Sequence, residues 1–242
     1  MVELSELELI SGFSSIIMIL FNFFLGIIMI RRYTQNKDRN VLFMSITMML
    51  VSQPWWSYAT ALLFILTTGK SFPLVVYLII GHIFQPVAIL LWMIVITELI
   101  WKKNQKFILS LSAIFSAIYE TTILYAIFVE PEMFATLEGP LDLRYLSLFL
   151  FCQVFALIVV IITGIMFFRE TRKSEKPENR LKGTLFLIAV LSYAIGAIID
   201  SALHLNLISL LIVRILLASS AFEIYGAFAM PKWIKKLFLR EE

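Results

Sequence analysis

The chain has 242 residues, of which 60% are hydrophobic and only 15% are charged, and its net charge is +3. An ordinary soluble domain carries roughly a quarter of its residues as charged types, and a soluble core could not hide so much apolar surface. The composition therefore excludes a soluble globular protein, predicts a chain that lies in a lipid bilayer, and gives no reason to expect a nucleic-acid partner.

Seven apolar runs divide the chain between clusters of charges, glycines and prolines. A spanning helix needs roughly 20 apolar residues, and backbone groups in lipid must bond to one another. The runs also lack the alternation of barrel strands, so helices are expected. The spans are residues 10–30, 41–67, 73–101, 107–129, 145–168, 184–203 and 208–230. We expect an all-α membrane protein, with residues 1–242 forming a single membrane domain, a seven-transmembrane-helix bundle.

Lys and Arg are distributed unevenly over this arrangement. Seventeen of the 20 fall on one side, in residues 31–39, 102–106, 169–182 and 232–240, and the positive-inside rule assigns that side to the cytoplasm. An even number of spans would break the pattern. The first nine residues contain no Lys or Arg, unlike a cleavable signal peptide. The sequence therefore predicts a multi-pass cell-membrane protein with an extracytoplasmic N-terminus, an acidic outer loop near residues 130–142, and a cytoplasmic C-terminus.

Local features modify this outline at three places. Pro54 and Pro86 lie within the second and third spans, where each removes a helix hydrogen bond and can bend the helix. After Pro231, apolar residues recur at helical spacing between lysines over residues 232–239. This pattern predicts a short interfacial helix on the anionic inner leaflet, with a solvated chain end as the alternative.

Polar side chains recur in the outer half of five of the predicted spans. Such groups cost several kcal/mol in hydrocarbon unless they are paired or hydrated. At about 1.5 Å of rise per residue, six of them fall in one layer. They are His82, Gln85, Glu120, Gln153, Asp200 and Arg214. We expect them to face a common pocket for a small or amphipathic ligand, and interhelical hydrogen bonds are the structural alternative.

Two acidic residues in the last two spans call for separate interpretations. Asp200 and Arg214 lie on either side of a short outer turn and are expected to pair, either as a fixed strut or as part of a binding site. Glu223 lies nine residues beyond Arg214, on roughly the opposite helix face, and so cannot share it. A bond to a neighbouring helix and a proton-coupled switch are the two readings of Glu223.

The chain lacks the defining residues of two well-known seven-span families. Residues 208–230 contain no Lys for a retinal Schiff base, as a microbial rhodopsin would need. The third span ends in TELIWKK, without the acidic-Arg-aromatic triplet of G-protein-coupled receptors, and YGAFAMP lacks their Asn-Pro-x-x-Tyr turn.

The closing sequence VRILLASSAFEIYGAFAMPKWIKKLF resembles the last helix of prokaryotic seven-transmembrane sensory modules, some of which are fused to kinase or PAS domains. The resemblance covers about a tenth of the chain. It implies a retinal-free, receptor-like sensor whose seventh helix leads into the cytoplasm. Because no output domain follows here, the expected output is a separate cytoplasmic signalling protein.

Other functions stay open at this point. In a small secondary transporter or proton-coupled carrier, Asp200, Arg214, Glu120 and Glu223 would form the pathway. In a zinc-dependent membrane hydrolase, His82, Asp200 and His204 would bind the metal. A scaffold without a ligand is a further alternative. We assign no catalytic residue, cofactor or metal, and a homo-oligomer is left open. A polar path reaching both faces would favour transport, whereas a closed inner half would favour sensing.

Overall fold

The structure is a computed structural model that describes residues 2–203 and 205–239, and it is almost entirely helical. Its α-helices are α1 (Glu6–Asn36), α2 (Arg39–Val51), α3 (Gln53–Thr68), α4 (Leu74–His82), α5 (Gln85–Ile100), α6 (Gln105–Phe128), α7 (Ser147–Arg172), α8 (Pro177–Ala202), α9 (Leu207–Ala229) and α10 (Lys232–Phe238). Two short 3-10 helices, η1 (Lys102–Asn104) and η2 (Pro131–Met133), and two strands, β1 (Ala135–Leu137) and β2 (Leu143–Tyr145), complete the described part.

Six helical segments are long and apolar enough to cross a membrane: α1, α4 with α5, η1 with α6, α7, α8 and α9. The pair formed by α2 and α3 passes the same test but bends by 48° between the two helices. The expected all-α membrane fold is therefore confirmed. The number of spans is seven if the bent pair counts as one.

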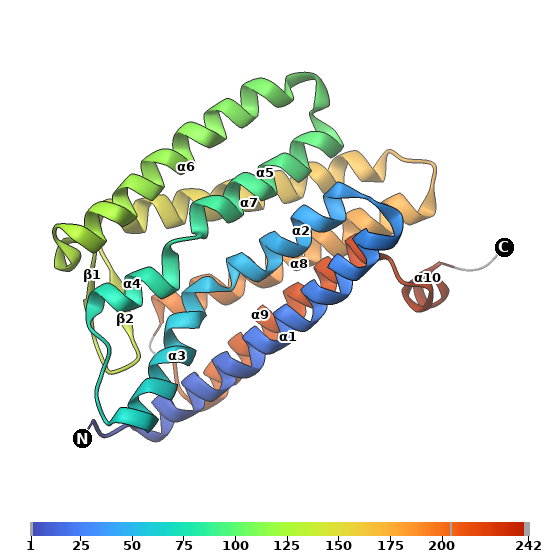
Figure 1. The fold of residues 1–242 in the computed structure, drawn as a ribbon. Coiled ribbons are helices and arrows are strands. Elements are labelled where there is room, and N and C mark those ends of the chain that lie inside the picture. Colours follow the sequence, from blue (N-terminus) through green and yellow to red (C-terminus); the bar gives the residue numbers. More distant parts are fainter. Residues whose placement is uncertain (1, 204, 240–242) are drawn as a thin grey trace.

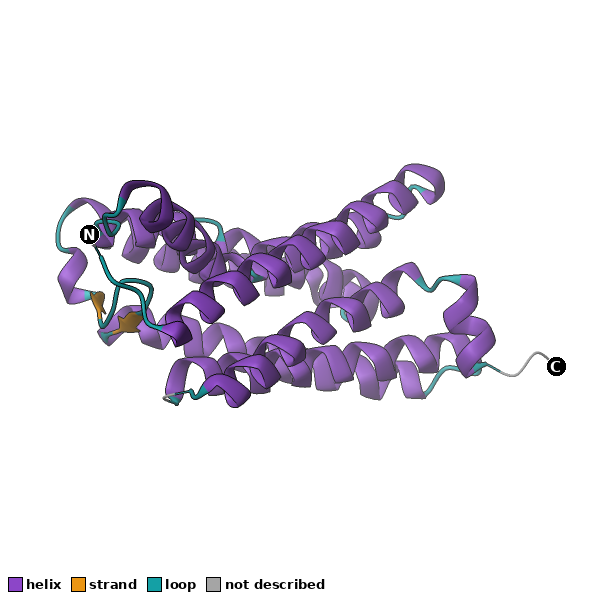
Figure 2. Cartoon of the chain, turned by 90° about the horizontal axis from the view of Figure 1, so that it is seen from below, coloured by secondary structure: helices purple, strands orange, loops and turns teal. Residues whose placement is uncertain are grey.

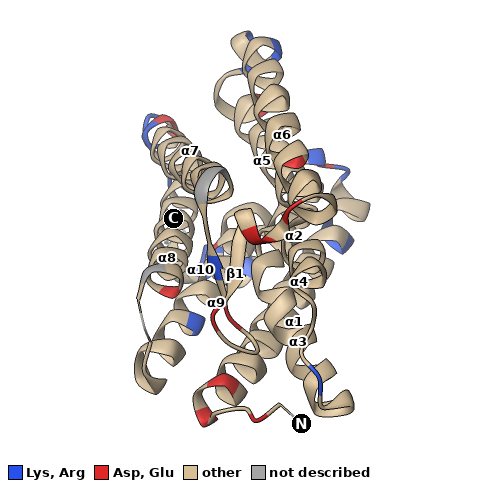
Figure 3. Cartoon of the chain, turned by 90° about the vertical axis from the view of Figure 1, so that its left-hand side faces the viewer, with Lys and Arg blue, Asp and Glu red and all other residues tan. Residues whose placement is uncertain are grey.

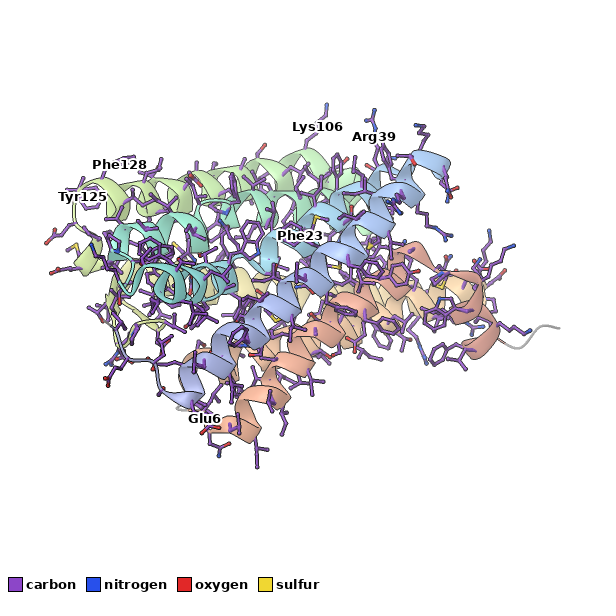
Figure 4. All side chains as sticks on the ribbon, turned by 60° about the horizontal axis from the view of Figure 1, so that its bottom comes forward. Glu6, Phe23, Arg39, Lys106, Tyr125 and Phe128 are labelled. Atoms are coloured by element: carbon purple, nitrogen blue, oxygen red, sulfur yellow. The ribbon has the colours of Figure 1, made fainter. Side chains whose placement is uncertain are left out.

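The long helices lie side by side and give the molecule two distinct ends (Figure 1; Figure 2). Helix α9 packs against α1 and α8, α8 packs against α7, and α5 packs against α2 and α6. The start of α1 and the β1–β2 hairpin lie at one end, called the hairpin end here. The α1–α2, α5–α6 and α7–α8 connections and α10 lie at the other, the basic end (Figure 1). In Figure 4, Glu6 and Phe128 mark the hairpin end, and Arg39 and Lys106 lie toward the basic end.

Two of the helical segments break close to the prolines at which the sequence predicts bends. Pro54 is the second residue of α3, and Ser52 separates α3 from α2. Pro86 is the second residue of α5, which follows α4 after Ile83 and Phe84. Proline lacks an amide hydrogen and fits the first turn of a helix, so each proline starts a new helical segment. The bend expected at Pro54 is confirmed by the 48° angle between α2 and α3, and at Pro86 the helix is interrupted between α4 and α5.

Gln53 repairs the break between α4 and α5. In an unbroken helix the Phe84 amide would donate to the Ile80 carbonyl. Here Phe84 N donates to Gln53 Oε1 at 2.9 Å, and Gln53 Nε2 donates to Ile80 O at 3.1 Å. The Gln53 side chain is 1% exposed. One amide therefore replaces the missing backbone bond, and it ties α3 to both halves of the broken helix.

The half of the bundle near the basic end is filled by aromatic and Met side chains. Trp92 stacks on Phe186 with ring centroids 5.0 Å apart, and Phe167 and Phe228 pack edge-on against Phe186. Trp92 Nε1 also donates to Thr163 Oγ1 at 2.9 Å. This aromatic cluster, residues 92, 167, 186 and 228, is surrounded by further buried side chains of α1, α2, α5, α8 and α9.

The chain between α6 and α7 forms a structured cap that the sequence did not predict. Strands β1 and β2 pair antiparallel, with Ala135 opposite Tyr145. Phe134, Leu141 and Leu143 are buried against the helix ends. Tyr77 donates its hydroxyl hydrogen to the Pro140 carbonyl. The fifth span was expected to start at residue 145, but Tyr145 belongs to the hairpin and α7 begins two residues later.

The expected short helix after Pro231 is confirmed as α10. Met230 takes the left-handed conformation with φ of 40°, which turns the chain at the end of α9. Within α10, Ile234 is buried, whereas Trp233, Leu237 and Phe238 are exposed. Lys235 Nζ lies 2.7 Å from Glu178 Oε1 and joins α10 to the start of α8.

Candidate functional site

A cavity of about 690 Å³ lies in the half of the bundle near the hairpin end. Its walls come from α3, α5, α7 and α8, and the β2 strand and the loop before it contribute the hairpin side. Most of the wall is apolar. The polar and charged side chains that line it are Trp55, Tyr58, Gln85, Glu138, Asp142, Arg144, Tyr145, Gln153, Tyr193, Asp200 and Ser201. Three of the six expected binding residues are therefore in the wall: Gln85, Gln153 and Asp200.

Asp200 is held by two donors from other helices. Arg214 Nη1 donates to Asp200 Oδ1 at 2.7 Å, and Trp55 Nε1 donates to Oδ2 at 2.7 Å. The Arg214 side chain is 5% exposed and the Asp200 side chain 13% exposed. The expected ion pair is thus confirmed. Because Arg214 does not line the cavity, it acts on the site only through Asp200.

Ser11 and Trp55 extend this pair, and neither was among the binding residues expected from the sequence. Arg214 Nη2 lies 3.4 Å from Ser11 Oγ on α1. Trp55 packs edge-on against Tyr193 with ring centroids 6.3 Å apart. Four helices, α1, α3, α8 and α9, therefore meet at one buried ion pair. No sequence spacing links Ser11 or Trp55 to the Asp200–Arg214 pair, so nothing short of the fold could have shown that these two residues join it.

His82 lies behind the cavity wall rather than in it. Its Nε2 is 3.1 Å from the Tyr145 hydroxyl, and its Nδ1 is 3.4 Å from Gln153 Nε2. If the Gln153 amide donates to Nδ1, a neutral imidazole can donate from Nε2 to Tyr145. His82 is fully buried and does not line the cavity. The expectation that His82 faces the pocket is corrected: it positions two residues, Tyr145 and Gln153, that do.

Burial raises the pKa of the Tyr145 phenol above its usual range, with smaller contributions from the carboxylates of Asp142 and Asp200. The phenol therefore stays protonated at neutral pH. Tyr145 also packs against Phe149 on α7, with ring centroids 5.5 Å apart. The hairpin is thus fixed to α4 and α7 at the edge of the cavity.

In the described part of the molecule, two polar groups of the cavity wall each lack one kind of partner: the Gln85 amide nitrogen has no hydrogen-bond partner, and the Asp142 carboxylate has no cation. Gln85 Nε2 is buried and has no hydrogen-bond partner among the described residues. Asp142 Oδ1 accepts from the Tyr58 hydroxyl at 2.7 Å and from the Leu143 amide at 2.9 Å. Within the part of the chain that the structure describes, no cation pairs with Asp142, whereas Glu138 pairs with Arg144 at 3.3 Å.

Glu120 and Glu223 lie outside the cavity. Glu120 is half-buried on α6 and is not part of the cavity wall, so the expectation that it shares a pocket with His82 and Gln85 is wrong. Glu223 lies on α9 in the half near the basic end. There Ser192 Oγ lies 3.5 Å from Glu223 Oε1. Of the four groups proposed as a transport pathway, only Asp200 lines the cavity.

The zinc alternative receives no support from the described side chains. Among residues 2–203 and 205–239, no group of three or more His, Cys, Asp and Glu residues is close enough to hold a metal ion. His82 and Asp200 bind different partners. His204 lies outside the described residues.

A small chamber of about 40 Å³ lies below the cavity, toward the basic end. Val51, Trp55, Val160 and Tyr193 line both spaces. The rest of the chamber wall is mostly apolar and includes Trp92, a member of the aromatic cluster. Four polar side chains also line the chamber: Asn22, Thr47, Ser52 and Ser220. The cavity therefore has a mainly apolar floor and ends where the tightly packed half begins.

Comparisons with protein-family models, with curated protein sequences and with solved structures found no match to this chain. Function is therefore inferred from the geometry of the cavity and its surroundings.

Proposed function

We propose that the chain crosses the cell membrane seven times, with the hairpin end outside and the basic end in the cytoplasm. The bent α2–α3 pair, taken as one span, runs from the basic end to the hairpin end, so that successive spans alternate in direction (Figure 1). Viewed from the hairpin end, acidic residues lie around the N-terminus and the hairpin (Figure 3). The positive-inside rule depends on Lys and Arg, most of which fall in the connections at the basic end (Figure 1).

We further propose that the protein is a retinal-free, receptor-like sensor that binds a small or amphipathic ligand in the cavity. The cavity carries this proposal, because its size falls within the roughly 300–1,000 Å³ typical of small-molecule sites. Mostly apolar walls with a few convergent polar groups are also typical of such sites. The unpartnered Gln85 amide is one group that a ligand would satisfy.

Sensing is favoured over transport by the contrast between the two halves. A carrier would need polar groups that continue toward the cytoplasm. Instead, the floor of the cavity leads to the aromatic cluster around Trp92 and Phe186. A ligand in the cavity would contact α3 and α5 next to their proline breaks, where Pro54 and Gln85 line the wall. Movement at these breaks would transmit binding to the basic end and to a cytoplasmic signalling partner.

The binding proposal is tested by thermal unfolding of the protein in lipid nanodiscs with a panel of small amphiphiles. A ligand that binds only the folded state raises the unfolding temperature. The matched variant is Ala197→Trp, which fills the cavity from α8. We expect at least one amphiphile to stabilise the original protein but not this variant. Stabilisation that persists in Ala197→Trp would place binding elsewhere, and no stabilisation by any member would contradict the proposal.

The choice between sensing and transport is tested with the same amphiphile after reconstitution into proteoliposomes. A sensor retains at most one bound molecule per protein, whereas a carrier accumulates many over time. Uptake that grows beyond the number of protein molecules would overturn the sensor proposal in favour of a carrier.

The orientation is tested with tags at the two chain ends in intact cells. A tag at Met1 should be accessible to an impermeant antibody, whereas a tag at Glu242 should become accessible only after permeabilisation. Equal accessibility of both tags would contradict the seven-span arrangement.

A further inference from the structure

The cavity changes in character along the bundle axis. At the hairpin side its wall carries Glu138, Asp142 and Arg144. The chamber beyond Val160 is lined mainly by apolar side chains, among them Met48 and Leu217. A ligand that matches this gradient has a polar head at the hairpin side and an apolar chain pointing toward the middle of the bundle.

The charges at the hairpin side determine the sign of that head. Arg144 is paired with Glu138, and Arg214 is paired with Asp200. Asp142 is the cavity-lining carboxylate with no cationic partner among the described residues. A single positive charge on the ligand would therefore neutralise the net negative charge of the cavity wall.

Aromatic rings lie beside the unbalanced carboxylate. Tyr58 bonds to Asp142 directly, and Tyr145 lies three residues further along the hairpin in the same wall. An ammonium group is attracted both by a carboxylate and by the faces of aromatic rings. A hydrated anion would meet repulsion from Asp142 at this position.

The cavity also borders the surface of the bundle between α7 and α8. Val154 of α7 and Ile198 of α8 line it and are 46% and 47% exposed. Nearer the basic end the same two helices touch closely, because a Cβ at Gly164 would lie 2.8 Å from Val190. The two helices therefore leave room for an alkyl chain only in the half near the hairpin end, where under the proposed topology the outer leaflet lies.

We propose that the ligand is a single-chain amphiphile with an ammonium head, drawn from the outer leaflet between α7 and α8. The head lies beside Asp142, and the alkyl chain extends past Val160 into the chamber. This inference rests on the proposed function, since it names the chemical class of the molecule that the cavity takes.

The test compares three probes that share one alkyl chain: dodecylammonium, dodecanol and dodecanoate. Each is titrated into the protein in phosphatidylcholine nanodiscs, and complexes are counted by native mass spectrometry, with empty nanodiscs correcting for partition into lipid. We expect dodecylammonium to bind about fivefold more tightly than dodecanol, and dodecanoate more weakly than either. The modest ratio reflects the solvent exposure of Asp142.

Two variants locate the head and the chain. Asp142→Asn should remove the advantage of dodecylammonium over dodecanol, because it keeps the size of the side chain and deletes the charge. Glu132→Gln is the matched control, because Glu132 lies in the same connection between α6 and α7 but outside the cavity wall, and it should leave the ratio unchanged. Val160→Phe should weaken dodecylammonium but not butylammonium, which is too short to reach the chamber.

The outcomes separate this inference from the proposed function. If the three dodecyl probes bind equally, or if dodecanoate binds best, the ammonium assignment is wrong while an amphiphile site remains. If Asp142→Asn leaves the ratio unchanged, the head does not lie beside Asp142. If none of the probes binds the original protein, the amphiphile inference is wrong, and the wider panel in the unfolding experiment then decides whether the cavity binds any ligand at all. Should Asp142→Asn fail to fold, the three-probe comparison on the original protein still decides the sign of the head.

Discussion

The two halves of the bundle are held together in different ways. Near the basic end, large apolar side chains pack around Trp92 and Phe186 and leave only a small chamber of about 40 Å³. Near the hairpin end, two of the helical segments are broken and a large cavity remains beside a second apolar cluster that includes Tyr77, Tyr119 and Phe149. The elements around the cavity itself are joined by a few polar contacts. The Asp200–Arg214 pair and the Gln53 bridge are the main ones.

This difference separates a part of the fold that is packed from a part that can hold a ligand. Apolar packing spreads stability over many small contacts and leaves little space between the helices. Polar bonds in a low-dielectric surrounding concentrate stability in a few residues and allow the walls between them to stand apart. If this account is correct, single polar substitutions should be most harmful around the cavity, and single apolar truncations should be more harmful in the aromatic cluster than in the cavity wall.

The largest effect is expected at the buried ion pair. Asp200→Ala leaves the Arg214 guanidinium buried without its carboxylate, which costs about 3–5 kcal/mol of unfolding free energy. Replacing both residues by neutral ones, Asp200→Asn with Arg214→Met, should cost less than Asp200→Ala alone. Unfolding in nanodiscs measures all the variants. Simple additivity of Asp200→Ala and Arg214→Ala would show that the pair contributes nothing as a pair.

Truncation in the aromatic cluster should come next. Phe186→Ala removes a fully buried ring that contacts Trp92, Phe167 and Phe228, at a cost of about 3 kcal/mol. Val154→Ala, in the cavity wall, is the matched control and should change stability by less than about 0.5 kcal/mol. Equal losses at the two sites would mean that the cavity is as tightly packed as the rest of the bundle.

The two glutamines at the breaks offer a closer comparison. Gln53→Met leaves Phe84 N and Ile80 O without partners and should cost about 2 kcal/mol. Gln85→Met removes a side chain whose Nε2 has no partner in the described residues, and should be within about 0.5 kcal/mol of neutral. Unfolding measurements on the two variants decide this. A larger loss for Gln85→Met than for Gln53→Met would contradict the role given to Gln53.

The smallest effect is expected at an exposed ion pair. Glu178→Gln breaks the contact with Lys235 of α10, where both side chains are more than a third exposed. Solvent weakens such pairs, so the change should be below about 0.5 kcal/mol. A loss comparable to that of Asp200→Ala would mean that burial does not make the Asp200–Arg214 pair more important for stability than an exposed pair.

Hydropathy and charge were enough to predict the helices and α10. The breaks near Pro54 and Pro86 followed from the prolines themselves. The Asp200–Arg214 pair was predictable because a short turn brings the ends of α8 and α9 together. Depth along a helix can be estimated from the sequence, but rotation about its axis cannot, and this caused the error at Glu120. Helix α6 turns Tyr119 and Ile123 inward and leaves Glu120 at the margin of the buried face.

Other features had no local signal. Gln53 reads as one more polar residue in a span, and its role follows only from the approach of α3 to a break 27 residues away. The hairpin strands are three residues each and carry little periodicity. Their position is set by contacts with distant helices, such as those of Tyr77 and Tyr58.

The central claim is that the cavity opens outward and ends at a closed floor. Cysteine accessibility from the two sides of the membrane tests this claim most directly. The background is Cys152→Ala, which removes the single native cysteine. Single cysteines are then placed at Ala197 in the cavity wall and at Ala227 in the packed half, which lines neither the cavity nor the chamber. We predict that an impermeant thiol reagent modifies Ala197→Cys from outside only and modifies Ala227→Cys from neither side. Modification of Ala227→Cys from the cytoplasmic side, or of Ala197→Cys from that side alone, would contradict the account.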